Sequence, residues 1–69
     1  METLDLHGVR HSNVDRIVEN FVIVNNLPIR IITGNSPQMR SIVFAVLLRH
    51  SFGWDYENHW NLGSIIVTN

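Results

Sequence analysis

The pair Asp5 and His7 is the part of this sequence best suited to chemistry. It lies in the opening run Leu4-Asp5-Leu6-His7-Gly8, ahead of a helical pattern. In an extended strand, residues two apart point to the same face, so we expect Leu4 and Leu6 to face the core and Asp5 and His7 to face away from it. A carboxylate beside an imidazole is suited to proton transfer near neutral pH, and it can also help to hold a divalent cation such as Mg²⁺ or Mn²⁺.

A second polar group follows the next predicted strand. Residues 29–33 are β-branched and nearly all apolar, which favours a central strand of a mostly parallel sheet. In such sheets, ligands bind at the carboxyl ends of the strands, where helix N-termini offer unpaired N–H groups to anions. We therefore expect a phosphate of a nucleic-acid backbone to bind here. The residues expected to line this site are Gly8, Arg10, Thr33, Gly34, Asn35, Ser36 and Arg40.

The elements that must position these residues follow from the spacing of the apolar side chains. Strands are expected at residues 3–7, 29–33, 54–57 and 64–68. Two strand–helix–strand units with right-handed crossovers give a βαβαββ order. We predict an α/β protein in the form of a two-layer α+β sandwich. Its four-stranded mixed sheet carries both helices on one face and leaves the other face open.

Both helices have recognisable start signals. Ser12 is expected to be the N-cap of the first helix, with Asp15 as its capping-box acid, and the helix is expected to end at an Asn-Asn-Leu-Pro segment. Ser36 is expected to cap the second helix, with Pro37 as its first residue. Gly53 is expected to stop that helix.

Composition limits the classes of function. The 69 residues form one domain, without cysteine, so disulfides and cysteine zinc sites are excluded. No apolar stretch approaches the roughly 20 residues of a membrane span, and the acidic N-terminus favours a cytoplasmic protein without a membrane partner. The net charge is −1, with five arginines and no lysine. A nucleic-acid role therefore needs a local arginine cluster, a metal ion or a tethering partner.

Three segments together resemble the Smr (small MutS-related) domain family. Residues 4–8 (LDLHG) resemble its signature, residues 31–36 (IITGNS) resemble its second motif I-I-T-G-x-G, and residues 61–67 are similar to its closing strand. The resemblance covers nearly the whole chain, as a single Smr-like domain at residues 1–69. It implies a βαβαββ domain that binds nucleic acid and, in several members, cleaves DNA or RNA as an endonuclease.

The resemblance also assigns site residues. Asp5 and His7 would take the family's functional positions, with Thr33 and Gly34 beside them. Ser36 stands where the family has a second glycine, and Pro-Gln replaces the histidine-serine pair that is common after it. Family members often belong to larger proteins, so we expect a protein or ribonucleoprotein partner to deliver the substrate.

Three functions remain open at this point. The first is an endonuclease that acts on RNA or DNA through Asp5 and His7. The second is a non-catalytic nucleic-acid or ribonucleoprotein adaptor, and the third is a protein-interaction module that uses the open sheet face. We expect the aromatic residues Trp54, Tyr56 and Trp60 to serve mainly as core, with stacking on bases as the alternative.

Overall fold

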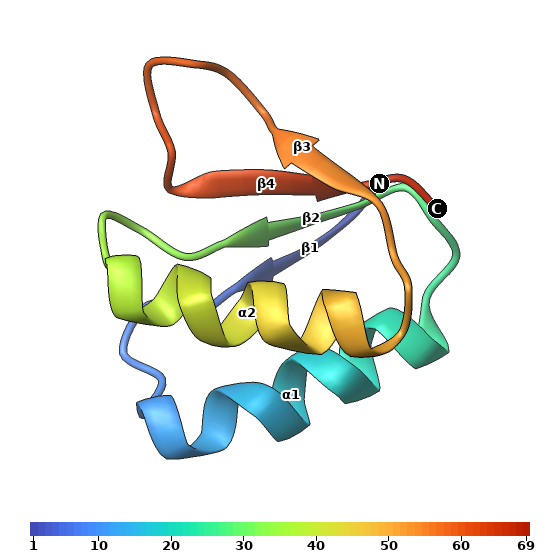
Figure 1. Cartoon of the computed structure of the whole chain (residues 1–69), viewed down its shortest axis with the longest axis horizontal. Helices are drawn as coiled ribbons and strands as arrows, with labels where there is room; N and C mark the ends of the chain where they lie inside the picture. Colours follow the sequence, from blue (N-terminus) through green and yellow to red (C-terminus); the bar gives the residue numbers. More distant parts are fainter.

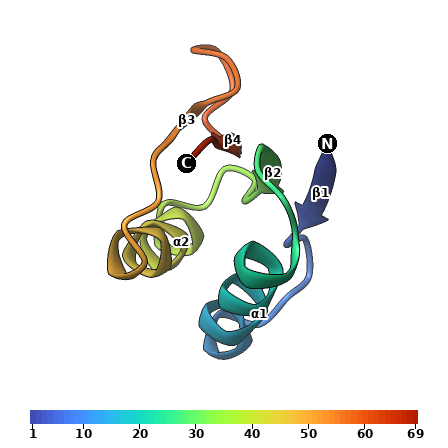
Figure 2. The same ribbon diagram turned by 90° about the vertical axis from the view of Figure 1, so that its right-hand side faces the viewer.

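The protein is a two-layer α+β fold in which two helices cover one face of a four-stranded sheet. The computed structural model describes all residues, 1–69. Figures 1 and 2 show both helices on the same side of the strands. The elements in chain order are β1 (Glu2–Asp5), α1 (His11–Val24), β2 (Ile29–Ile32), α2 (Pro37–Arg49), β3 (Trp54–Tyr56) and β4 (Ser64–Val67). The βαβαββ order and the mixed sheet are confirmed.

The strand order in the sheet is β1-β2-β4-β3. β1 pairs with β2 in parallel, whereas β4 pairs antiparallel with β2 on one side and with β3 on the other. β1, β2 and β3 therefore run in the same direction, and the last strand is inserted between the second and the third. Because of this insertion, only one of the three strand pairings is parallel. The expectation of a mostly parallel sheet is therefore wrong, since two of the three pairs are antiparallel.

The core lies between the sheet and the helices. Along β2 and β4, Ile29, Ile31, Ile65 and Val67 are fully buried, and the residues that alternate with them face the other side. The buried helix residues are Val14, Val18 and Val22 of α1 and Met39, Val43, Val46 and Leu47 of α2. Each fully buried aliphatic side chain contributes roughly 1.5–3 kcal/mol, so this single layer of side chains supplies most of the driving force for folding.

The predicted start of α2 is confirmed, whereas the predicted start of α1 is wrong. α2 begins as expected, because the Ser36 hydroxyl accepts a hydrogen bond from the Met39 N–H at 3.1 Å. α1 begins at His11, with Arg10 at the N-cap position and no capping side chain. The expected cap at Ser12 is therefore wrong. The acid expected to complete it, Asp15, is instead bound to Arg49 of α2.

The first strand and the second helix end earlier than the sequence predicts. β1 ends at Asp5, although the Leu6 N–H still donates to the Ile32 carbonyl at 2.9 Å. α2 ends at Arg49, and it is Ser51, with φ +59°, that takes the left-handed position after it. Gly53 is thus not the residue that stops this helix. Neither helix is long and apolar enough to cross a membrane.

Candidate active site

The open face of the sheet carries two rows of polar side chains. The register places Thr3, Arg30, Ile66 and Asp55 in one row and Asp5, Ile32, Ser64 and Glu57 in the next. Alternation along each strand leaves these side chains opposite the helices. The face that the sequence predicts to be open is therefore a largely polar surface.

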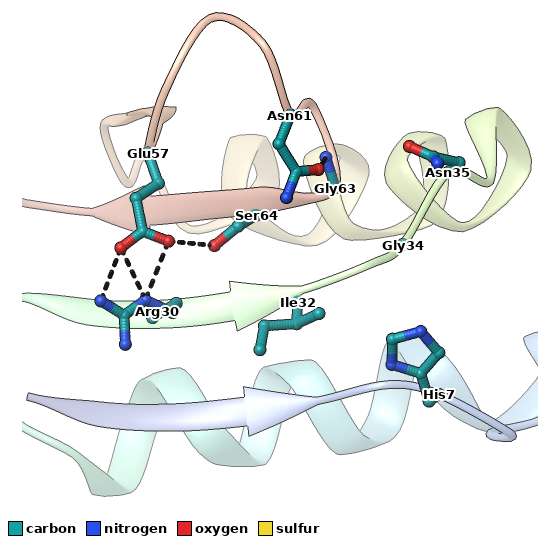
Figure 3. A pocket seen from close by; sticks show the side chains of 9 residues that line it. All are labelled: His7, Arg30, Ile32, Gly34, Asn35, Glu57, Asn61, Gly63 and Ser64. Carbon is teal, nitrogen blue, oxygen red and sulfur yellow. Dashed lines mark hydrogen bonds and ion pairs between the residues drawn. The ribbon is translucent and has the colours of Figure 1, made fainter.

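A hollow of about 500 Å³ lies where the second row meets the carboxyl ends of β1 and β2. Figure 3 shows His7 after β1 on one side of β2 and Asn61 before β4 on the other. The lining residues are His7, Arg30, Ile32, Gly34, Asn35, Glu57, Asn61, Gly63 and Ser64. Ile32 is the only hydrophobic residue among them, so the hollow suits a polar ligand.

Asp5 and His7 form a direct pair at the edge of this hollow. One carboxylate oxygen of Asp5 accepts the backbone N–H of His7 at 2.9 Å and lies 2.7 Å from Nδ1 of the imidazole. The backbone bond, followed by the side-chain bond, lowers the pKa of the Asp5 carboxyl below its ordinary value. Asp5 is therefore ionised at neutral pH, and its exposure to solvent favours the same state.

This pairing fixes the tautomer of the neutral imidazole. An ionised carboxylate only accepts hydrogen bonds, so Nδ1 of His7 carries the proton and Nε2 keeps its lone pair. Nε2 of His7 lies next to Gly34. A Cβ atom added to Gly34 would be 3.5 Å from this nitrogen. This arrangement leaves Nε2 of His7 free on the side of the hollow, where its lone pair can accept a proton.

Gly34 and Gly63 hold the floor of the hollow together. The Gly63 carbonyl accepts the N–H of Thr33 at 2.8 Å and of Gly34 at 3.1 Å. A Cβ at Gly63 would lie 2.9 Å from the Gly34 carbonyl carbon, so only glycine permits this approach. Gly34 itself has φ +67°, as its predicted turn requires. Because its N–H is already bonded, this turn does not offer that group to a phosphate.

Arg30 and Glu57 neutralise each other on the far wall. The guanidinium donates from Nη2 to Glu57 at 2.6 Å and from Nε at 3.0 and 3.1 Å, and Nη1 lies 3.3 Å from the Thr3 hydroxyl. Glu57 also accepts the Ser64 hydroxyl at 2.6 Å. The Ser64 bond, followed by that from Arg30, lowers the pKa of Glu57. This wall therefore presents a fixed ion pair (Figure 3).

The predicted site residues do not all reach the hollow. His7, Gly34 and Asn35 line it, whereas Asp5 does not line it and is bonded to His7. Gly8 (φ +74°) is an exposed turn residue, and Arg10 is exposed at the N-cap position of α1.

The other three predicted residues lie behind the turn that follows β2. Thr33 is buried, and its hydroxyl bonds to the Gly34 carbonyl at 3.1 Å. Ser36 caps α2, and the Arg40 guanidinium bonds to the same Gly34 carbonyl at 3.3 Å. These three residues therefore shape the turn and do not line the hollow.

Sequence reasoning missed the far wall of the hollow. Arg30 gives a signal, because it is the only charged residue in an otherwise apolar strand. Glu57, Asn61 and Ser64 give no such signal, since their approach to β2 depends on the insertion of β4 beside it. Asn61, Gly63 and Ser64 all lie in the closing segment at residues 61–67, which is singled out only as part of the family resemblance.

The residues present do not fit a metal ion held by the protein alone. Nowhere in the chain do three or more His, Asp or Glu side chains come together that could hold one. Asp5 supplies one carboxylate, and its bonded oxygen already accepts two hydrogen bonds from His7.

Comparison with known proteins finds no matching family model, no matching curated protein and no matching solved structure.

Proposed function

We propose that this protein binds nucleic acid at the hollow and cleaves its phosphodiester bonds, with His7 as general base. The observation that carries the proposal is the 2.7 Å contact between Asp5 and Nδ1 of His7, which leaves Nε2 free on the side of the hollow. The resemblance of residues 4–8 and 31–36 to the Smr motifs supports the same assignment. The cytoplasm is the compartment in which we expect this activity.

The proposed reaction begins with removal of a proton by Nε2 of His7. The proton comes from the nucleophile, which is a ribose 2′-hydroxyl in RNA or a water molecule. The imidazolium that forms faces the Asp5 carboxylate, which stabilises its charge and holds the ring in place. The oxygen of the nucleophile then attacks phosphorus, and the bond to the leaving oxygen breaks. That oxygen departs with the electron pair of the bond and takes a proton from water.

Two arginines near the turns are suited to the phosphate charge. Arg10 and Arg40 have no carboxylate partner, whereas Arg30 and Arg49 are held in ion pairs. Arg40 reaches the turn through the Gly34 carbonyl, and Arg10 follows His7 by three residues. Their charges would attract the backbone to this rim of the sheet, although a chain with a net charge of −1 binds weakly without a partner that delivers the substrate.

The test is cleavage of labelled single-stranded RNA, with single- and double-stranded DNA in parallel and with a chelator lane. We expect His7→Ala to lower the cleavage rate about 100-fold or more, which is the usual contribution of a positioned acid or base. Asp5→Asn should lower it less, because the amide oxygen still orients the ring. His11→Ala is the matched control, since His11 is exposed and does not line the hollow.

Each other outcome separates the alternatives. Equal rates for the parent and His7→Ala would contradict the assignment of the base. A gel shift without product would indicate a non-catalytic adaptor. Neither cleavage nor a shift would favour a protein partner on the open face. Thermal unfolding of each variant checks that it is folded.

A further inference from the structure

Trp60 is the most exposed large apolar side chain of the chain, at 93%. It lies in the loop between β3 and β4, which stands away from the helices in Figures 1 and 2. The other tryptophan behaves differently, because Trp54 stacks on Phe44 with ring centroids 4.1 Å apart and planes at 9°. Trp60 has no aromatic partner in the protein, so both faces of its indole are free of stacking.

Hydrogen bonds within the loop hold the backbone around Trp60 in place. The Asn58 side-chain oxygen accepts the backbone N–H of Trp60 at 3.1 Å and of Asn61 at 2.6 Å. The Asn61 side-chain oxygen accepts the N–H of Gly63 at 2.9 Å. The backbone on both sides of Trp60 is therefore fixed before any ligand arrives, which lowers the entropy lost on binding.

The same loop forms one wall of the candidate active site. Asn61 and Gly63 line the hollow, and Trp60 is the residue immediately before Asn61. His7 lies on the opposite wall (Figure 3). A strand whose phosphate lies at His7 can therefore direct a neighbouring base toward the loop.

On the open sheet face, the charges near the Trp60 loop favour bases over phosphates. Glu57 and Asp55 place two carboxylates there against the single guanidinium of Arg30. Two arginines near the site lack a carboxylate partner. Arg10 follows His7 by three residues, and Arg40 binds the carbonyl of Gly34, the residue next to the His7 ring. The backbone of a bound strand is thus attracted to the rim of His7, with its bases over the sheet.

We infer that Trp60 is a stacking platform for an unpaired nucleobase, so that the site takes single-stranded rather than duplex nucleic acid. This inference rests on the proposed function. An aromatic ring stacks on any base, but a base inside a duplex is already covered on both faces by its neighbours. Trp60 therefore selects strandedness rather than sequence.

The experiment uses the His7→Ala variant, which should bind without cleaving. Adding Trp54→Phe leaves Trp60 as the only tryptophan fluorophore. The probes are 12-mers of uridine RNA and thymidine DNA, an abasic DNA 12-mer with the same phosphates, and a 12-base-pair duplex. We expect the two single strands to quench Trp60 fluorescence, and the abasic strand and the duplex to leave it nearly unchanged.

Affinities measured by anisotropy complete the test. Trp60→Ala should weaken single-strand binding about 5- to 150-fold, and Trp60→Phe should retain most of it. Leu62→Ala is the matched control, because it removes another exposed apolar side chain of the same loop. Circular dichroism checks that each variant is folded.

The outcomes separate this inference from the function on which it rests. If Trp60→Ala binds single strands as well as the parent while His7-dependent cleavage persists, the role of Trp60 is wrong and the nuclease stands. If no probe binds and no substrate is cleaved, both are wrong. If Trp60→Ala changes only self-association, measured by sedimentation, the indole is a protein contact and the inference is overturned.

Discussion

At the scale of single residues, the site depends on two very short-range arrangements. Asp5 binds both the backbone N–H and the imidazole of His7, so one carboxylate holds the backbone and the ring of that residue. Gly63 presses against Gly34 at a distance that no side chain tolerates. The first arrangement makes the proposed base, and the second keeps the floor below it in position.

Gly63→Ala should therefore destabilise the protein and distort the hollow. The added methyl group meets Gly34 backbone atoms at 2.9–3.0 Å, and such overpacking typically costs about 1–3 kcal/mol. Denaturant unfolding measures the loss of stability, and the amide resonance of Gly34 reports the displacement. Gly8→Ala is the control, since its methyl group meets nothing within 4 Å and only the left-handed backbone is strained. If Gly63→Ala left both the denaturation midpoint and the Gly34 resonance unchanged, the proposed need for close contact between Gly63 and Gly34 would be contradicted.

At the scale of elements, the two helix starts depend on different interactions, one local in the sequence and one long-range. Ser36 and Pro37 begin α2 with a bond between residues three apart, so the local sequence suffices. α1 carries an equally suggestive Ser12, yet its chain turns into the helix one residue before that serine. There the contact between Asp15 and Arg49, 34 residues apart, takes the acid that a capping box would use.

Substitution of the two serines distinguishes a real cap from an apparent one. Ser36→Ala should lower the free energy of unfolding by about 1 kcal/mol, the usual loss for an N-cap. Ser12→Ala should be nearly neutral, because the Ser12 side chain makes no hydrogen bond. Chemical denaturation of both variants under the same conditions checks this. Equal losses would show that Ser12 caps α1 after all.

At the scale of the whole molecule, ion pairs between α1 and α2 add to the core that the two helices share. Arg49 of α2 binds Asp15 and Glu19 of α1, and His50 lies 3.2 Å from the same Glu19. Arg49 lowers the pKa of Asp15, and His50 followed by Arg49 lowers that of Glu19. Together with Asp5 and Glu57, four of the six carboxyls thus have a lowered pKa in the folded protein.

Acid should therefore destabilise the fold. A carboxyl whose folded pKa is below its unfolded value stabilises fully above the unfolded value, near pH 4, and loses that contribution as the pH falls through the folded value. We expect the free energy of unfolding to fall between about pH 5 and pH 2. Arg49→Met should flatten this dependence, whereas Arg16→Met, which removes an arginine without an ion pair, should leave it intact. Urea titrations at several pH values measure how the free energy of unfolding changes with pH. If this free energy changed equally with pH in both variants, the role of Arg49 would be contradicted.

The sequence by itself determined the order of elements, the core-facing side of the first strand, the start of α2 and the position of Asp5 and His7 on the side away from the core. These features follow from side-chain periodicity and from bonds between residues close in the chain. Only the tertiary structure decided that β4 lies between β2 and β3, and with it the approach of Glu57 to Arg30 and of Gly63 to Gly34. Those contacts join residues 27 and 29 positions apart, so they exist only once the sheet has set its register.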